Sequence, residues 1–147
     1  PNLRDLRTFD SEKYLLKKPL DGVVVEGRVS WNLKAARLVL ERGLPLLLEK
    51  PAETDLNEFR RLVEIARSRN IPLQMAYLFR WMPAMRALVQ RTRHGDLGRI
   101  YHFRGRLPKE LSGYAEYAAT LGEYRGGIFF EMAGHLVDLM ITLLGPP

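Results

Sequence analysis

The sequence predicts an α/β fold, in which the later part of a doubly wound parallel sheet is followed by the start of a second α/β domain. Two observations support this class. Residues 20–77 alternate between short apolar runs and longer segments whose apolar residues recur at helical spacing. From residue 83 onward the pattern changes to a helix, a strand and a long apolar helix. We therefore expect one domain over residues 1–78 and a second over residues 79–147.

Three short apolar runs predict the strands of the parallel sheet. They lie at residues 23–25, 44–48 and 73–77, and each is bounded by glycine or proline. Continuous apolar runs of this length are typical of strands that are covered on both faces. Because helical segments separate the runs, the connections should be right-handed crossovers with helices packed on the sheet.

Two predicted helices connect these strands. Ser30 is the expected N-cap of the first helix, which should stop at Gly43. Asp55, followed three residues later by Glu58, forms a capping-box pattern at the start of the second, which should end near Asn70. Each helix has one apolar face. The residues of these faces are Leu33, Ala36, Val39 and Leu40 in the first helix, and Leu56, Phe59, Leu62, Val63 and Ala66 in the second.

The second domain should begin with a helix that Pro83 opens and Gly95 ends, followed by a strand over about residues 100–107. One face of that strand is apolar and the other carries histidine and arginine, so one face should pack and the other meet water or a partner. Residues 108–125 should be mostly loop, with a short helix at 114–119. A last helix over residues 128–144 is apolar almost all round, so we expect most of its circumference to be buried.

Composition restricts the classes of function. A chain with 46% hydrophobic and 27% charged residues has the balance of a soluble globular protein. No apolar run reaches the roughly 20 residues of a membrane span, and residues 1–5 lack the apolar core of a signal peptide. These features predict a cytoplasmic protein without membrane association.

Cysteine, histidine and charge exclude further classes. The chain has no cysteine and its three histidines lie far apart, so neither thiolate catalysis nor a metal site is expected. The net charge of +6 is compatible with a nucleic-acid module. The arginines, however, are dispersed and form no basic stripe interleaved with aromatic residues, so we do not expect nucleic-acid binding.

Glu49, Lys50 and Pro51 directly follow a predicted buried strand. This places them at the carboxyl end of a parallel sheet, where doubly wound folds bind their ligands. A lysine there can be activated by desolvation, or can donate a hydrogen bond that polarises a reacting hydroxyl or carbonyl oxygen. Charged residues after strands also occur on solvated loops, so spacing alone leaves both interpretations open.

A polar stripe interrupts the last apolar helix. Glu131, His135, Asp138 and Thr142 follow steps of four, three and four residues, which places them along one face. One interpretation is a solvated helix edge, or a core histidine satisfied by Glu131. The other is a carboxylate that orients an imidazole for proton exchange near neutral pH.

Five ordered segments between residues 21 and 145 carry a further pattern. They are DGVVV at 21–25, GLPLLLEKP at 43–51, YLFRWMP at 77–83, GDLGRI at 95–100, and GG at 126–127 leading into Glu131 and His135. This order resembles the oxidoreductases named after glucose–fructose oxidoreductase, inositol dehydrogenase and MocA, the Gfo/Idh/MocA family.

The resemblance implies a Rossmann-type sheet, with a partial dinucleotide-binding domain over residues 1–78 and the beginning of the substrate and oligomerisation domain over 79–147. It also implies hydride transfer between NAD or NADP and a hydroxyl carbon of a sugar, polyol or related compound, in a protein that is a homo-oligomer when complete.

The same resemblance implies roles for individual residues. Lys50 would contact the reacting oxygen, His135 would be the acid/base, and Glu131 would hold the histidine. The implied cofactor contacts are Glu49, Lys50, Pro51, Gly27, Arg28, Asn32 and Arg80.

The sequence also departs from the family pattern. The family usually has aspartate where Glu131 stands, and Asn32 lies near the place of a usual histidine. No Gly-x-Gly-x-x-Gly turn is present to hold a pyrophosphate, so we expect a fragment or incomplete gene product that binds a nicotinamide cofactor weakly or not at all. A non-catalytic remnant that binds a partner chain is the alternative function.

Overall fold

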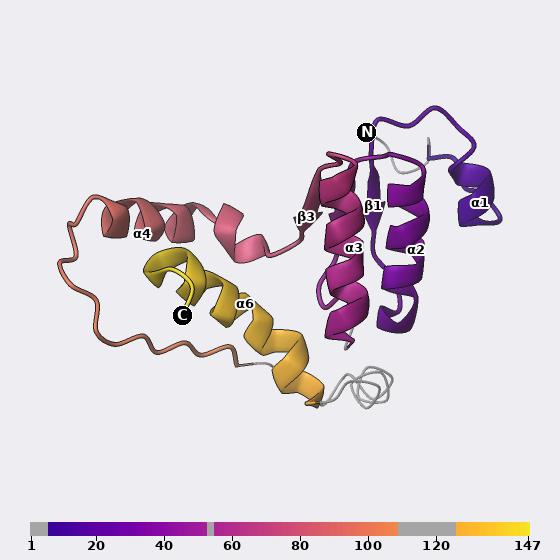
Figure 1. Cartoon of the computed structure of the whole chain (residues 1–147). Coiled ribbons are helices and arrows are strands. Elements are labelled where there is room, and N and C mark those ends of the chain that lie inside the picture. Colours follow the sequence, from indigo (N-terminus) through magenta and orange to yellow (C-terminus); the bar gives the residue numbers. More distant parts are fainter. Residues whose placement is uncertain (1–5, 53–54, 109–125) are drawn as a thin grey trace. The chain divides into compact units, whose positions relative to one another are not determined.

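The computed structural model describes residues 6–52, 55–108 and 126–147, and the chain divides into two units, Pro1–Met75 and Ala76–Pro147 (Figure 1). The sequence placed its domain boundary three residues further along, between residues 78 and 79. The short helix expected at 114–119 lies outside the described residues.

The first unit is built on a parallel sheet of three strands in the order β1 (Val23–Val25), β2 (Leu46–Leu48) and β3 (Leu73–Met75). Val24 pairs with Leu47, which in turn pairs with Gln74. The predicted α/β class and the three parallel strands are confirmed. β2 and β3 are each two residues shorter than predicted.

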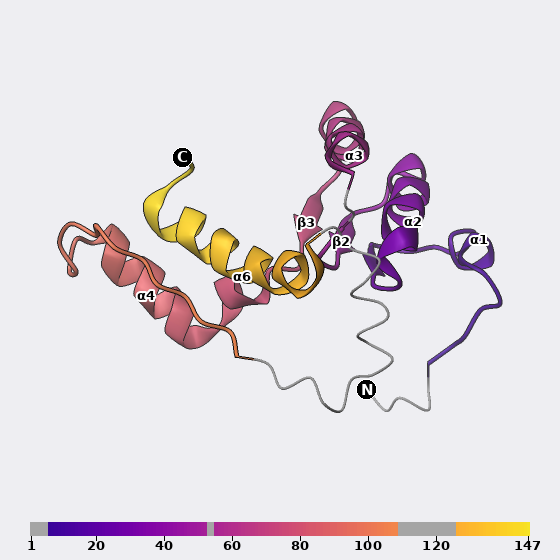
Figure 2. The same cartoon turned by 90° about the horizontal axis from the view of Figure 1, so that it is seen from below.

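Two helices, α2 (Val29–Glu41) and α3 (Leu56–Ser68), lie on the same side of the strands (Figure 2). Their apolar faces pack on one face of the sheet and on each other, and most of the residues that the helical spacing predicted are buried or half-buried there. Leu56, which was also expected on this face, is 58% exposed. On the other face of the sheet, Val24 and Leu47 are exposed. The core of the unit consists of Val25, Ala36, Val39, Leu40, Leu46, Leu48, Ala52, Leu62 and Ala66.

The start of α2 differs from the prediction. Its N-cap is Arg28, whose backbone is extended, and Ser30 already lies inside the helix. Val29 is buried, so its packing fixes the first turn one residue ahead of the serine. Ser30 is therefore not the cap that the sequence indicated, and Arg28 makes no side-chain capping bond.

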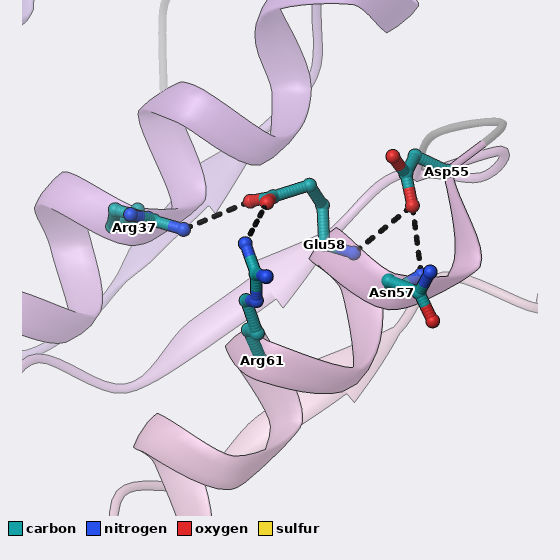
Figure 3. A network of polar contacts seen from close by, with 5 residues as sticks. All are labelled: Arg37, Asp55, Asn57, Glu58 and Arg61. Atoms are coloured by element: carbon teal, nitrogen blue, oxygen red, sulfur yellow. Dashed lines mark hydrogen bonds and ion pairs between the residues drawn. The ribbon is translucent and has the colours of Figure 1, made fainter.

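The start of α3 confirms half of the predicted capping box (Figure 3). The Asp55 carboxylate accepts hydrogen bonds from the backbone N–H of Asn57 at 2.8 Å and of Glu58 at 3.2 Å. The other half of the prediction, a bond from the Asp55 backbone N–H to the Glu58 side chain, is wrong. The Glu58 carboxylate instead accepts from Arg37 on α2 at 2.9 Å and from Arg61 on α3 at 2.5 Å, since charge-assisted bonds to guanidinium are stronger than a bond to a neutral N–H. Glu58 thus joins the two helices.

A further helix, α1 (Glu12–Leu15), was not predicted. It has four residues, none of them buried, and is too short to show a helical period in the sequence.

The second unit is helical in its described part. It contains the 3₁₀-helix η2 (Leu78–Trp81), α4 (Pro83–Arg93) and α6 (Gly127–Leu144). Pro83 is the first residue of α4, and Gly145 follows α6 with a φ of 86°, in the left-handed region that favours glycine. Both predicted boundaries are confirmed.

The strand predicted over residues 100–107 is not formed, and these residues have no regular secondary structure. A strand requires a neighbour that pairs with its backbone N–H and C=O groups. In the part of the chain that the structure describes, the sheet consists only of β1, β2 and β3, none of which pairs with this segment. The alternation of apolar and polar residues at 100–107 is therefore not sufficient to form a strand.

The prediction that most of the circumference of α6 is buried is wrong. Phe129 is 75% exposed and Val137 and Met140 are exposed as well, while Leu139 is the one buried apolar side chain of the helix. The buried face carries the polar stripe instead. The described elements that pack on α6 are η2 and α4, and η2 lies against the polar face, where Arg80 and Phe79 meet Asp138 and His135.

Candidate functional site

The residues singled out from the sequence lie in both units. In the first unit, the Glu49 backbone N–H donates to the Val25 carbonyl at 2.9 Å, which continues the pairing of β1 and β2 by one residue. The loops that follow the two strands therefore leave the same edge of the sheet. Lys50 and Pro51 are half-buried there, and the Lys50–Pro51 peptide bond is cis.

A hollow of about 480 Å³ lies at the end of β1 and over the first turns of α2. It includes Gly27, Arg28 and Asn32, three of the predicted cofactor contacts. Asn32 is a buried polar side chain, and a Cβ built on Gly27 would lie 3.6 Å from its Oδ1. The exposed indole of Trp31, which sequence reasoning did not select, also lines the hollow.

The hollow has the properties of a small-molecule site. Its volume is within the range of ligand pockets, roughly 300–1,000 Å³, and it combines an aromatic wall with polar and charged groups. It lies at the carboxyl end of a parallel strand, where doubly wound sheets bind ligands. These residues could hold part of a nicotinamide cofactor.

In the second unit, the predicted polar stripe is buried. Glu131 is 7%, His135 8% and Asp138 7% exposed, so the interpretation as a solvated helix edge is wrong. Thr142, the last residue of the stripe, donates its hydroxyl to the Asp138 carbonyl at 2.7 Å. The described part of the chain thus holds an imidazole and two carboxyl groups on one enclosed helix face.

The His135 ring lies against two aromatic side chains from the segment between β3 and α4. The Phe79 ring stacks on it, with 4.9 Å between centroids and 19° between planes. Tyr77 meets it edge-on, at 6.2 Å and 83°. A Cβ built on Gly134 would lie 3.6 Å from Tyr77 Cε1, so the tyrosine also packs over the helix backbone beside His135.

Arg80 makes a bidentate ion pair with Asp138. Arg80 Nε lies 2.7 Å from Asp138 Oδ2, and Nη2 lies 2.5 Å from Oδ1. The hydrogen bond to Asp138 raises the pKa of the Arg80 guanidinium, and partial burial opposes this. Burial raises the pKa of the Tyr77 phenol, and the negative charge of Asp138 adds to the effect while Arg80 opposes it. Tyr77 therefore stays a neutral hydrogen-bonding group at physiological pH.

The structure brings the predicted residues together in two groups. Gly27, Arg28 and Asn32 line the hollow of the first unit, in which Glu49, Lys50 and Pro51 follow the neighbouring strand. Glu131, His135 and Arg80 belong to the second unit. Arg80 was expected to contact the cofactor, and the structure gives it a partner within the chain. Its role at a cofactor stays a prediction.

Sequence reasoning did not select Tyr77, Phe79 or Asp138 as site residues. The signal for the first two was available, because residues 77–81 (YLFRW) contain three aromatic side chains directly after a strand. Which of these rings reaches His135 depends on the turn of η2, and no spacing rule fixes that. Asp138 was visible only as part of the stripe.

Comparisons with characterised proteins place the chain among oxidoreductases. It is 29% identical over 141 residues to the rhizopine catabolism protein MocA of Rhizobium meliloti, covering 95% of this chain and 43% of that protein. It is 34% identical over 140 residues to trans-1,2-dihydrobenzene-1,2-diol dehydrogenase of Macaca fascicularis, with 95% and 41% covered. It is 24% identical over 126 residues to scyllo-inositol 2-dehydrogenase (NAD⁺) of Bacillus subtilis, with 86% and 36% covered.

Solved structures agree on the fold. The myo-inositol 2-dehydrogenase of Lactobacillus plantarum superposes with a TM-score of 0.83 at 23% identity, over 93% of this chain and 41% of that one. The WlbA dehydrogenase of Bordetella pertussis, solved with NADH and UDP-GlcNAcA, superposes with a TM-score of 0.74 at 26% identity, over 95% and 42%. No family model matches the chain.

The three-stranded parallel sheet with its helices thus has the fold of part of the Rossmann-type domain of inositol dehydrogenase structures. The chain is homologous to the oxidoreductases of the Gfo/Idh/MocA family. It spans about two fifths of the length of the relatives that it matches.

By length and composition alone, α6 could also cross a membrane, a property that the sequence analysis did not assign to any segment. Core helices of soluble proteins share these properties but are mostly buried. In α6, 22% of the residues are buried within the described structure, among them Glu131, His135 and Asp138.

Proposed function

We propose that this chain is the middle part of a dehydrogenase that transfers a hydride between NAD or NADP and a hydroxyl carbon of a sugar, polyol or related diol. The observation that carries the proposal is the enclosed face of α6, where His135 lies one helical turn after Glu131 and against Phe79. A buried imidazole beside a carboxyl group is suited to proton transfer near neutral pH. Supporting this, relatives named as dehydrogenases of an inositol and of a dihydrodiol match over 86% and 95% of this chain.

In the proposed reaction, oxidation of the alcohol breaks the C–H and O–H bonds of the substrate. A bound nicotinamide would accept the hydride. His135 accepts the hydroxyl proton, and Glu131 stabilises the imidazolium that forms. Lys50 donates a hydrogen bond to the reacting oxygen, which becomes a carbonyl oxygen. Gly27, Arg28 and Asn32, at the hollow, are the candidate contacts to the cofactor.

We further propose that the complete protein is a cytoplasmic homo-oligomer. We expect the 147-residue chain itself to bind the cofactor weakly or not at all, because it contains no glycine-rich turn with which to hold a pyrophosphate. Arg80 and the residues that follow β2, including Glu49 and Pro51, are proposed to lie near the cofactor.

Cofactor titration and turnover test the proposal. Nicotinamide fluorescence is measured with this chain and with a longer polypeptide extended upstream, followed by turnover of the longer one on inositols, sugars and trans-diols. We expect binding and turnover in the longer protein only. A longer protein that binds NAD(P)H but oxidises none of these would exclude the substrate class. One that binds no cofactor would favour the alternative, a non-catalytic remnant.

A further inference from the structure

The imidazole of His135 is held by side chains that come from another element. Phe79 stacks on one face of the ring and Tyr77 lies edge-on to it. Both belong to the segment that forms and precedes η2, whereas His135 belongs to α6. The orientation of the imidazole therefore depends on how η2 is fixed on α6.

Packing alone gives η2 little support. It is a 3₁₀-helix of four residues, none of them buried, and Leu78 and Trp81 are both exposed. Short 3₁₀ turns also have weaker hydrogen-bond geometry than α-helices. Apolar burial at η2 is thus limited to partly covered side chains such as Phe79, which leaves a role for a polar contact.

The ion pair of Arg80 with Asp138 is placed to do this. Arg80 directly follows Phe79 in the chain, and Asp138 lies three residues, nearly one helical turn, after His135. Two parallel hydrogen bonds, of 2.7 and 2.5 Å, join the guanidinium to the carboxylate. A bidentate arginine–carboxylate pair fixes orientation as well as distance, which a single point contact does not.

We propose that Arg80 and Asp138 are positioning residues for His135: their bidentate pair anchors η2 to α6 and keeps the Phe79 and Tyr77 rings against the imidazole. The importance of this positioning for catalysis rests on the proposed function. The positioning of His135 by the pair does not depend on that function. A ring held in this way presents one edge in a fixed direction and is shielded from water, as a proton-transfer group requires.

An electrostatic role for the pair makes a different prediction. Among the described residues, the charged and titratable groups near His135 include Glu131 and Asp138 on α6, and Arg80 and Tyr77 from the segment at η2. Removing the Arg80 cation and removing the Asp138 anion would have opposite electrostatic effects on the imidazole. Loss of the anchor would have the same effect in both cases, because either change releases Phe79.

Proton NMR of the three histidine rings in this chain distinguishes an anchoring role of the Arg80–Asp138 pair from an electrostatic role. The Cε1 proton of His135 should lie upfield because the Phe79 ring current shields it, whereas exposed His94 and His102 provide reference positions. The shift of the His135 signal in Phe79→Leu gives the change that corresponds to complete loss of ring-current shielding. We expect Arg80→Gln and Asp138→Asn both to move the His135 signal downfield by at least half of that change. Arg80→Lys should fall between wild type and Arg80→Gln.

The matched control is Arg91→Gln, which breaks an exposed pair with Asp96 in the same unit and should leave the His135 signal in place. An unmoved signal in both Arg80→Gln and Asp138→Asn, or shifts of opposite sign, would overturn the proposal. If circular dichroism shows that Arg80→Gln is unfolded, Asp138→Asn and Arg80→Lys decide, since the first is nearly isosteric with the wild type and the second keeps the positive charge while it loses the bidentate geometry.

Turnover of the longer protein separates this proposal from the proposed function. Arg80→Lys and Asp138→Asn should lower kcat about tenfold to a hundredfold, the scale of a misplaced catalytic group, with the KM for the alcohol substrate nearly unchanged. If His135→Asn leaves turnover intact, the proposed function fails, and the NMR shifts still test whether the Arg80–Asp138 pair positions His135. If His135→Asn is inactive and the two anchor variants have normal kcat, the anchor proposal fails alone.

Discussion

Single residues show how a buried environment changes the meaning of a sequence pattern. The stripe of Glu131, His135 and Asp138 could be a solvated edge as long as only its spacing is known. Burial of all three side chains changes this, because polar groups are enclosed only where partners compensate the lost hydration. The bidentate pair of Arg80 with Asp138 is such a partner.

Lys50 is expected to act on the reacting oxygen. In the longer protein, Lys50→Ala should lower turnover by about tenfold to a thousandfold, the effect of losing one hydrogen-bond donor to the transition state, with little loss of cofactor affinity. Lys50→Arg should restore little, because the planar guanidinium fills the space differently. Steady-state kinetics check this against Lys13→Ala, which removes an exposed lysine of the same unit. Near wild-type turnover in Lys50→Ala would return the Glu49–Pro51 segment to an ordinary solvated loop.

His135 must be neutral to accept a proton, so activity for alcohol oxidation should rise with pH as the imidazole titrates. Ionised Glu131 favours the imidazolium, so Glu131→Gln should lower the histidine pKa and move the rising limb toward lower pH. His135→Asn should flatten the limb and lower the rate roughly a hundredfold or more. The pH profile of kcat is the measurement, with exposed His94→Asn as its control. A limb that survives in His135→Asn with the same midpoint identifies another base.

At the scale of the elements, α2 and α3 are joined by more than their apolar faces. Leu40 and Leu62 are buried between helix and sheet, while Glu58 binds Arg37 on the neighbouring helix. The carboxylate and both arginines are partly exposed, so the ion pairs contribute little compared with the burial of apolar area. Stability at this scale depends on packing and on the cap at Asp55.

The cap of α3 gives a prediction for stability. Asp55→Ala leaves the N–H groups of Asn57 and Glu58 without their acceptor and should cost about 1 kcal/mol of the free energy of unfolding. Asp55→Ser should retain most of it, because a hydroxyl oxygen also accepts at an N-cap. Urea midpoints measure the difference, with Asn57→Ala as a control that leaves the backbone bond intact. Equal midpoints for Asp55→Ala and wild type would contradict a stabilising cap.

At the scale of the whole molecule, large apolar side chains are exposed on both units. Val24 and Leu47 lie on the open face of the sheet, and Phe129, Val137 and Met140 lie on α6. Contiguous apolar surface of this kind is typical of interfaces or of surfaces covered by further chain. The chain corresponds to about two fifths of its relatives, so such surfaces are expected in it.

We therefore expect the 147-residue chain to self-associate. Sedimentation should give a mass that rises with protein concentration, and the thermal transition should broaden or depend on concentration. The combined change Val24→Lys and Phe129→Lys should reduce association because it places charge on both surfaces. Leu97→Lys, at an exposed apolar residue outside them, is the control. A monomer with a sharp, concentration-independent transition would refute the prediction.

By itself the sequence determined the parallel sheet, the presence of the two helices that pack on it, the glycine stop of α6 and the resemblance to the Gfo/Idh/MocA oxidoreductases. These depend on local periodicity, on caps and on the order of motifs, which are properties of neighbouring residues. The tertiary structure decided that residues 100–107 are not a strand, that α6 buries its polar face, and that Phe79 and Arg80 reach His135 and Asp138. Each of these depends on which distant segment supplies a pairing edge, a covering surface or a counter-charge, and the period of a single segment contains no such information.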